Sequence, residues 1–398
     1  MCIKIPTFEE MSLEQDLVYN LPTKGRFLIS GPPGTGKSIV ALHRAARIFA
    51  DETMHVRGKS HVVLIMRSKL LHLWTSSAIS TSGSEVQEST IVSFNTWFEG
   101  WYRLAIGQNV PKIENPNSSV VNHKSDAQSP FREFDWQKIT ERVYEAEEDL
   151  LPIHKFDLII DEGQDLPPDF WILTNIIARS VTVFADDNQR LTELNTQTKD
   201  IREYASIPEE NSFLLQKNYR NSVEVAKVAA NFYVGLSSGI PNLPERRSGI
   251  DPSLHSFLEQ KDQWSFIARY LDNNPTKQIG VFLPSYHLAN ELQNFVTKNS
   301  KANSQIYRNE FGKIQEVVDP CRPGLLITYL DNAKGLEFDA VFVPSLDKWH
   351  HQIDFETKMK LYVLASRSRQ DLHFSWAGAG KPAVLKQFPL DLLPVKRH

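Results

Sequence analysis

The sequence predicts an α/β protein of two domains, each built on a parallel β-sheet, with a small insertion in the first domain. Its 398 residues exceed the length of one ordinary hydrophobic core. Short apolar runs are followed by stretches with helical spacing, as in the strand-helix units of a parallel sheet. One of these units, residues 26–44, joins its strand to its helix through a glycine-rich loop.

This glycine-rich loop has the form G-x-x-x-x-G-K-[ST]. Glycines let several backbone N–H groups turn inward around an anion, and the N-terminus of the following helix adds its positive dipole end. The pattern predicts a phosphate-binding loop in which Lys37 reaches the β- and γ-phosphates and the Ser38 hydroxyl ligates Mg²⁺. A glycine-rich turn that fits the form by accident is the alternative, and the flanking strand and helix disfavour it. The loop residues assigned to a nucleotide are Gly31, Gly34, Thr35, Gly36, Lys37 and Ser38.

Composition narrows the class of protein. The 44 Lys and Arg residues against 48 Asp and Glu residues give a formal net charge of -4, so any surface for a polyanion must be local. Cys2 and Cys321 form neither a disulfide framework nor a metal-binding spacing, which is typical of a reducing compartment. No apolar run approaches the ~20 residues that span a bilayer, and residues 1–10 lack a basic start followed by an apolar core. We expect a soluble cytoplasmic protein with no membrane partner.

Local patterns predict the elements around the loop. A helix is expected to begin after Ser12, with Gln15 three residues later as the partner in a capping box. Apolar runs predict strands at 61–66 and 88–94.

The stretch between these strands and the next one has a different composition. Residues 107–130 are rich in Asn, Ser and Pro, and a charged helical pattern follows at 135–150. We interpret residues 99–150 as a small lobe inserted into the first domain.

A buried-type strand at 156–160 ends in adjacent carboxylates. Asp161 is expected to hold Mg²⁺ through water, and Glu162 to accept a proton from the attacking water. Alone, two carboxylates after a strand fit a solvated turn equally well, but the glycine loop favours the catalytic interpretation. We expect this strand to run directly beside the loop strand. A further strand is expected at 180–185.

The order of these motifs resembles that of a superfamily 1 helicase of the UvrD/Rep type. The run from Asp161 to Asp165 is similar to the family's DExQD box, and residues 185–189 are similar to its G-D-x-x-Q box, with alanine in place of glycine. The resemblance implies that Gln189 senses the γ-phosphate and that Gln15 reads adenine. For Gln15, the capping-box role stays open as the alternative.

Three motifs in the second half extend the resemblance. They are the run K-N-Y-R ending at Arg220, the run A-K-G-L-E-F around Glu337, and the run Y-V-L-A-S-R-S-R around Arg367. The resemblance implies that Glu337 binds the nucleotide and that both arginines reach the γ-phosphate across a domain cleft. Without the motifs, each arginine fits a surface ion pair equally well. Two RecA-like P-loop domains are implied, at 1–212 with the lobe at about 99–150, and at 213–398.

The resemblance also implies ATP and Mg²⁺ as cofactors and a single strand of nucleic acid, DNA or RNA, as the track. Phosphate contacts and aromatic faces are what a single-strand groove needs. Phe94 and Trp97 fit core packing equally well. The positions where the family touches the strand are Arg67, Lys69, Ser93, Phe94, Asn95 and Trp97.

The sequence departs from the family in three places. The aromatic residues expected after Gln189 are replaced by Arg190–Leu194, and the stretch from Val296 to Arg322 has room for a loop or one helix only. The histidine before the A-K-G-L-E-F run is missing. These departures weaken the case for processive unwinding more than that for ATP hydrolysis. They leave open a second function: a nucleotide-gated regulatory or sensor subunit in a repair or defence complex with a protein partner.

Overall fold

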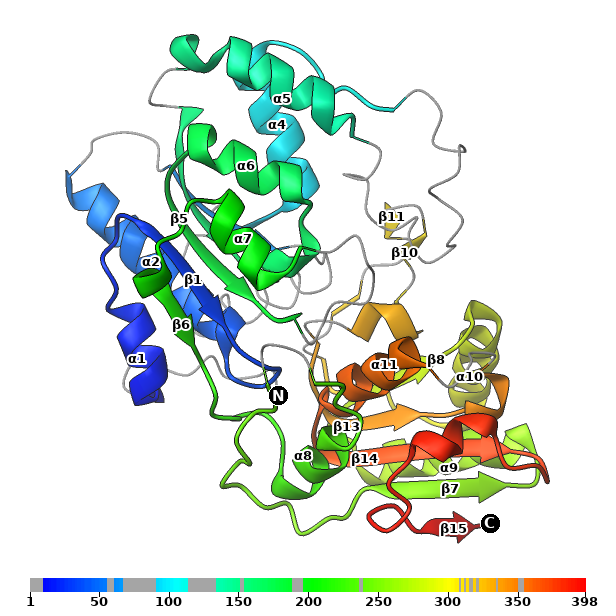
Figure 1. Ribbon diagram of the computed structural model, residues 1–398. Helices are drawn as coiled ribbons and strands as arrows, with labels where there is room; N and C mark the ends of the chain where they lie inside the picture. Colours follow the sequence, from blue (N-terminus) through cyan, green and yellow to red (C-terminus); the bar gives the residue numbers. More distant parts are fainter. Residues whose placement is uncertain are drawn as a thin grey trace.

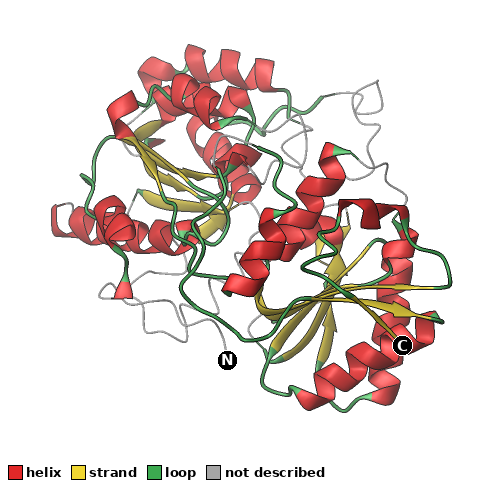
Figure 2. Ribbon diagram, turned by 60° about the horizontal axis from the view of Figure 1, so that its bottom comes forward, coloured by secondary structure: helices red, strands yellow, loops and turns green. Residues whose placement is uncertain are grey.

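Two parallel β-sheets, each covered by helices on both faces, make up the protein (Figures 1 and 2). This arrangement confirms the predicted α/β class with two parallel sheets. The computed structural model describes residues 10–55, 61–66, 91–113, 134–150, 154–187, 196–235, 239–307, 309–310, 313–314, 318–319, 322–333, 336–349 and 354–398.

The first sheet has the strand order β3-β2-β4-β5-β1-β6, and all of its neighbouring strands are parallel. The last strand, β6, pairs with β1 as far as Leu214, two residues beyond the expected domain boundary. The strands are β1 (Arg26–Ser30), β2 (Val62–Met66), β3 (Ile91–Ser93), β4 (Phe156–Ile160), β5 (Ala178–Ala185) and β6 (Ser212–Leu214).

Helices cover both faces of this sheet, each with its own buried cluster. The helix α1 (Leu13–Tyr19) begins with the predicted capping box, because Ser12 Oγ accepts from Gln15 N and Gln15 Oε1 accepts from Ser12 N. α1 and α2 (Lys37–His55) lie on one face. On the other face lie α4 (Phe94–Ile106), α5 (Trp136–Glu145), α6 (Pro168–Ile177) and α7 (Thr198–Tyr204).

The strand order corrects the expectation that the carboxylate strand runs directly beside the loop strand. The carboxylate strand β4 pairs with β2 and β5, and β5 lies between β4 and the loop strand β1. Both β4 and β5 are almost wholly buried, so their local patterns do not reveal which of them adjoins β1. The glycine loop and the carboxylates still meet at one edge of the sheet, about two strand spacings or ~10 Å apart.

The predicted lobe shares its core with the first domain. Helices α4 and α5 contribute to one buried cluster with α6 and the sheet. Phe94 and Trp97, with 2% and 9% of their surface exposed, lie inside this cluster, and the ring of Phe94 meets that of Phe170 edge-on at 4.9 Å. Core packing is therefore the role that the structure shows for both aromatics. The predicted strand 88–94 is also corrected, since β3 ends at Ser93 and Phe94 begins α4.

The second sheet has the order β15-β7-β14-β13-β8-β12-β9, and its neighbouring strands are again parallel. Helices α8 (Val223–Ala230) and α11 (Phe355–Ala365) cover one face, and α9 (Gln260–Asn273) and α10 (Tyr286–Asn299) the other. The strands are β7 (Ser253–Phe257), β8 (Gln278–Leu283), β9 (Ser304–Ile306), β12 (Gly324–Tyr329), β13 (Phe338–Val343), β14 (Ser368–Ala377) and β15 (Val395–Arg397).

The stretch from Val296 to Arg322, expected to be a loop or one helix, contains the edge strand β9 and a small antiparallel hairpin. The hairpin strands are β10 (Asn309–Glu310) and β11 (Lys313–Ile314). Within the described residues, no helix has the length and apolar character needed to cross a membrane.

Candidate active site

The glycine loop connects the end of β1 to the start of α2, as predicted, and two of its glycines have left-handed backbone. Gly34 and Gly36 have φ angles of 88° and 82°, a conformation that other residues rarely adopt. A Cβ atom on Gly34 would lie 2.5 Å from Asn218 Oδ1, and one on Gly36 would lie 2.4 Å from Gln15 Nε2. The loop is therefore enclosed by α1 on one side and by the chain entering the second domain on the other.

Lys37 folds back over the loop from the first turn of α2. Its Nζ donates to the carbonyl oxygens of Gly31, at 2.6 Å, and Pro32, at 3.0 Å, and lies 3.6 Å from Asp186 Oδ2. Only 6% of the residue is exposed. The adjacent Thr35 is also buried and donates its hydroxyl to the Pro32 carbonyl at 3.0 Å. An ammonium group held only by carbonyls and one distant carboxylate can exchange these partners for phosphate oxygens.

Gln15 links the start of α1 to the loop. Besides its capping role, it donates from Nε2 to the Thr35 carbonyl at 3.1 Å, and 8% of the residue is exposed. The capping-box interpretation is therefore confirmed, and the side chain also contacts the loop directly. Its reading of adenine stays a prediction.

Asp161 supplies a buried carboxylate at the end of β4. Burial, and then the charge of Glu162, raise the pKa of Asp161 to about 7, while the Ser38 hydroxyl and the Lys37 ammonium lower it. Asp161 Oδ1 accepts from Glu162 N, but Oδ2 is buried without a hydrogen-bond partner. A buried acceptor of this kind costs free energy unless a donor or a cation reaches it.

Glu162 is held in an unusual conformation by a polar network. Its φ of 56° is left-handed, a strain that clusters at functional sites in proteins. Its Oε2 accepts from Gln164 Nε2 at 2.6 Å, and Gln164 Oε1 accepts from Asp186 N at 3.0 Å. Gln164 thus ties the end of β4 to the end of β5 and fixes the direction of the Glu162 carboxylate.

Arg220 lies at the entry to the second domain, directly over the glycine loop. The backbone N–H of Tyr219 donates to the Gly34 carbonyl at 2.8 Å, and a Cβ on Gly34 would lie 3.3 Å from Arg220 Cβ. The Arg220 side chain turns to the second domain, where Nε donates to Glu337 Oε2 at 2.5 Å. Burial alone would raise the pKa of Glu337, but the Arg220 and Arg369 charges outweigh burial and hold that pKa below its usual value.

Arg367 lies directly before β14 and interacts electrostatically with carboxylates that follow β4 and β5. The residue is 1% exposed, and its Nε donates to the Val363 carbonyl at 2.9 Å while Nη2 donates to Ser366 Oγ at 3.0 Å. Burial lowers its pKa to about 9, so the guanidinium stays charged near neutral pH. The carboxylates whose charges favour this charged form come from both domains and are Glu162, Asp186 and Glu337.

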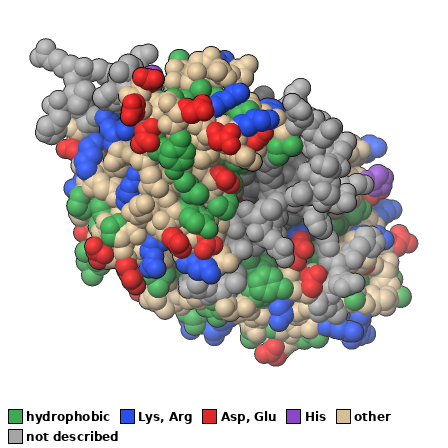
Figure 3. Space-filling model, turned by 45° about the horizontal axis from the view of Figure 1, so that its top comes forward, with side chains coloured by type: hydrophobic (Ala, Val, Ile, Leu, Met, Phe, Trp, Pro, Cys, Tyr) green, Lys and Arg blue, Asp and Glu red, His purple; other side chains and the backbone are tan. Residues whose placement is uncertain are grey.

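Of the predicted nucleic-acid residues, the structure describes Ser93, Phe94, Asn95 and Trp97, which lie together where β3 meets α4. Arg67 and Lys69, together with the γ-phosphate sensor Gln189, lie outside the described residues. Ser93, at the end of β3, and Asn95, in the first turn of α4, are half-buried, and Ser93 Oγ lies 2.8 Å from Thr96 Oγ1. Figure 3 shows basic and acidic side chains interspersed on the face that it draws.

Two features of the second domain were missed by the sequence analysis. Arg369 contacts Glu337 at 3.2 Å and Asp339 at 3.1 Å, and only its place two residues after Arg367 could have drawn attention to it. Tyr286 and Tyr329, at the carboxyl ends of β8 and β12, stack with ring centroids 5.6 Å apart. Both tyrosines are half-buried and belong to neither buried cluster of the second domain, and no local pattern predicts their contact.

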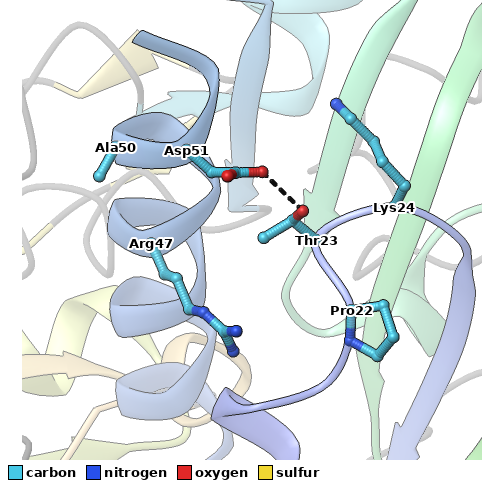
Figure 4. Close-up of a pocket in the computed structure, with 6 residues that line it drawn as sticks. All are labelled: Pro22, Thr23, Lys24, Arg47, Ala50 and Asp51. Atoms are coloured by element: carbon cyan, nitrogen blue, oxygen red, sulfur yellow. Dashed lines mark hydrogen bonds between the residues drawn. The ribbon is translucent and has the colours of Figure 1, made fainter. Parts of the chain in front are cut away.

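A separate pocket lies at the opposite edge of the first sheet. Figure 4 shows it between α2 and the turn before β1, where Thr23 Oγ1 donates to Asp51 Oδ2 at 2.7 Å. Its lining residues are Pro22, Thr23, Lys24, Arg47, Ala50 and Asp51. Because β1 separates it from the glycine loop, this pocket is not part of the candidate site.

Comparisons with known proteins address mainly the second domain. No curated protein matches the chain. Among solved structures, the C-terminal domain of a possible DNA helicase from Lactobacillus plantarum is 18% identical, with a TM-score of 0.33, covering 44% of this chain and 98% of that one. The sequence profile of the UvrD-like helicase C-terminal domain matches residues 326–375, the segment that holds Glu337 and Arg367. This match supports a helicase-type function.

Proposed function

We propose that the chain is an ATP-dependent translocase or helicase of the UvrD-like type, acting on a single strand of nucleic acid, with DNA as the expected track. One observation carries the proposal. Arg220 lies against the glycine loop that holds Lys37, and Arg367 interacts electrostatically with Glu162 and Asp186 after β4 and β5, so the groups of both domains lie near one another. Hydrolysis of ATP requires this set of groups, since phosphoryl transfer depends on positioning and charge neutralisation more than on covalent chemistry.

The site fits ATP with Mg²⁺. The Asp161 carboxyl interacts with the Ser38 hydroxyl and keeps Oδ2 without a hydrogen-bond partner, which suits a Mg²⁺ ion that keeps several waters and takes one carboxylate from the protein. When bound, Mg²⁺ neutralises charge on the phosphate oxygens. Among the described residues, no cluster of three or more His, Cys, Asp or Glu side chains could form an all-protein metal cage.

Each residue of the cleft then has a distinct task. Lys37 exchanges the loop carbonyls for the β- and γ-phosphates. Glu162, oriented by Gln164, accepts a proton from the attacking water. Arg220 and Arg367 stabilise the negative charge that grows on the transferring group, for which planar guanidinium donors are suited.

Movement follows from the division of these groups between two domains. The glycine loop belongs to the first domain and both arginines are attached to the second. Bound ATP therefore favours the closed arrangement of the two domains, and its hydrolysis lets them separate. Repeated closing and opening along a bound strand is translocation. The stacked pair of Tyr286 and Tyr329 offers aromatic surface for bases in the second domain, in addition to the positions proposed from the first.

A second candidate function is a nucleotide-gated sensor subunit. It is favoured by the burial of Phe94 and Trp97, which removes two aromatic faces from the first-domain surface. Such a subunit would bind ATP in the same cleft but respond to a protein partner instead of travelling along nucleic acid.

ATP hydrolysis with Mg²⁺ tests the proposal and separates the two candidates. Turnover should be stimulated by single-stranded DNA or RNA. It should fall about a hundredfold or more in Lys37→Ala, because that variant lacks the positive charge that stabilises the transferring phosphate. The matched control is Lys24→Ala, which removes a mostly exposed lysine paired with Asp157 at the other edge of the sheet. Turnover that persists in Lys37→Ala would disprove the site. Lack of stimulation by any nucleic acid would favour the sensor.

A further inference from the structure

We propose that Arg369 is a positioning residue that makes the release of Arg220 from Glu337 reversible. Arg220 can then move to ATP and return to Glu337. This inference rests on the proposed function. Glu337 holds Arg220 through Oε2 and Arg369 through Oε1, at 2.5 and 3.2 Å. Arg369 in turn contacts Asp339 Oδ1 at 3.1 Å. The four side chains form a chain of alternating charge in the order Asp339, Arg369, Glu337, Arg220.

The burial of this chain makes its charge balance important. The side chains of Glu337, Arg369 and Arg220 are 14%, 15% and 17% exposed. Two cations match two anions while Arg220 is docked. A buried carboxylate that loses its partner is strongly unfavourable, much more than the loss of an exposed ion pair.

Arg220 must leave Glu337 to reach the transferring phosphate. When it leaves, Arg369 stays on Glu337 and keeps that carboxylate paired. Without Arg369, each closing of the two domains would leave Glu337 buried without a hydrogen-bonded cation, with only the charge of Arg367 nearby, and the docked state would be favoured over the closed one. Arg369 thus reduces the free-energy difference between the two positions of Arg220 without touching the nucleotide.

Arg369 also fixes the backbone next to Arg220. Its carbonyl accepts from Ser222 N at 2.8 Å and from Arg246 Nη2 at 2.8 Å, and Arg246 Nη2 also donates to the Arg220 carbonyl at 2.8 Å. The Arg220 carbonyl is therefore tied to the second domain while the side chain exchanges partners. A substitution of the Arg369 side chain leaves its carbonyl in place and tests the charge alone.

A double-mutant cycle tests the proposal. In Arg369→Ala, kcat for ATP hydrolysis should fall about tenfold or more with little change in KM, because a buried carboxylate is stranded only when the cleft closes. In the Glu337→Gln background position 337 carries no charge to strand, and Asp339 loses its Arg369 contact in both backgrounds. Arg369→Ala should therefore cost less than about threefold relative to Glu337→Gln alone. Arg369→Lys, which keeps the charge but not the forked contact, should recover part of the lost kcat.

A matched control lies at the far edge of the first sheet. Arg179 pairs with buried Asp157, which Lys24 also holds, so Arg179→Ala removes one of two cations from a buried carboxylate outside the cleft. Its kcat should equal that of wild type. Thermal melting verifies that each variant is folded, and Arg369→Gln replaces Arg369→Ala if the alanine variant does not fold.

The outcomes separate the inference from the proposed function. Turnover in wild type that Lys37→Ala abolishes supports the proposed function by itself. Equal losses from Arg369→Ala in both backgrounds, an unchanged kcat, or an Arg369→Lys variant as slow as Arg369→Ala would then overturn the inference alone. Wild-type protein without ATP turnover would overturn both.

Discussion

At the scale of single residues, the charged side chains of the site are held by protein groups that a bound nucleotide or cation would replace. Lys37 is held by loop carbonyls, Arg220 by Glu337, and Asp161 carries a proton more readily than an exposed carboxylate does. Each group is therefore desolvated yet ready to exchange its partner for a phosphate or a cation. Burial is what makes these exchanges sensitive to pH and to ligands.

Asp161→Asn tests the buried carboxylate through protein stability. The pKa of Asp161 is raised from 3.8 to about 7, so above pH 4 the folded state binds more protons than the unfolded state and stability falls as pH rises toward 7. Asparagine does not titrate. The melting temperature of the variant minus that of wild type, measured without Mg²⁺, should therefore be several degrees larger at pH 8 than at pH 5. The same difference at both pH values would contradict this prediction.

At the scale of elements, the loop is shaped by its neighbours as much as by its own sequence. The positive φ of Gly34 and Gly36 comes from the loop, but the space around them is closed by Asn218 and Gln15. The first domain therefore positions the start of the second by direct contact with the loop.

Gly34→Ala should displace Asn218 and with it Arg220, because the new Cβ would lie 2.5 Å from Asn218 Oδ1. We expect kcat for ATP hydrolysis to fall about tenfold or more, since small misplacements of catalytic groups are costly. Gly107→Ala is the matched control, because Gly107 has a similar φ of 75° and no neighbour within 4 Å of the added Cβ. It should lose about 1 kcal/mol of stability from backbone strain and keep its activity. Equal kcat values for the two variants would refute a steric role for Gly34.

The local sequence pattern predicts the individual elements better than it predicts which elements lie beside one another. The loop between β1 and α2, the capping box and the carboxylates after β4 follow from residue types at fixed short spacings, and each is found where expected. The position of β5 between β4 and β1, the burial of Phe94 and the contact between Glu337 and Arg369 depend on residues distant in sequence. An aromatic residue or an arginine has the same local signature whether it packs inside or binds a ligand.

At the scale of the whole molecule, two domains with separate cores meet through polar contacts. None of the four buried clusters among the described residues contains residues of both sheets. The contacts across the boundary include the hydrogen bond between Tyr219 and Gly34 and the ion pair between Arg220 and Glu337. Among the described residues, no buried apolar cluster bridges the two domains and would hold them together without a ligand.

Calorimetry should accordingly resolve two unfolding transitions in the absence of nucleotide, because separate cores unfold separately when their interface is polar. A non-hydrolysable ATP analogue with Mg²⁺ should raise both transitions, since residues of both domains contact the proposed site. In Lys37→Ala the shift of both transitions should shrink. An analogue that raises one transition alone would argue against a site shared by the two domains.

The chain between the sheets leaves very little freedom for relative motion. Leu215 N and Tyr219 N are tied to Ser30 and Gly34 of the first domain, whereas Ser222 N is tied to Arg369 of the second. Only Arg220 and Asn221 lie between these attachments. A rotation of one domain against the other must therefore pivot at Arg220 itself. The residue about which the domains rotate is then also the arginine proposed to contact the transferring phosphate. Hydrolysis would therefore act directly on the hinge, with no intervening residue to transmit the change.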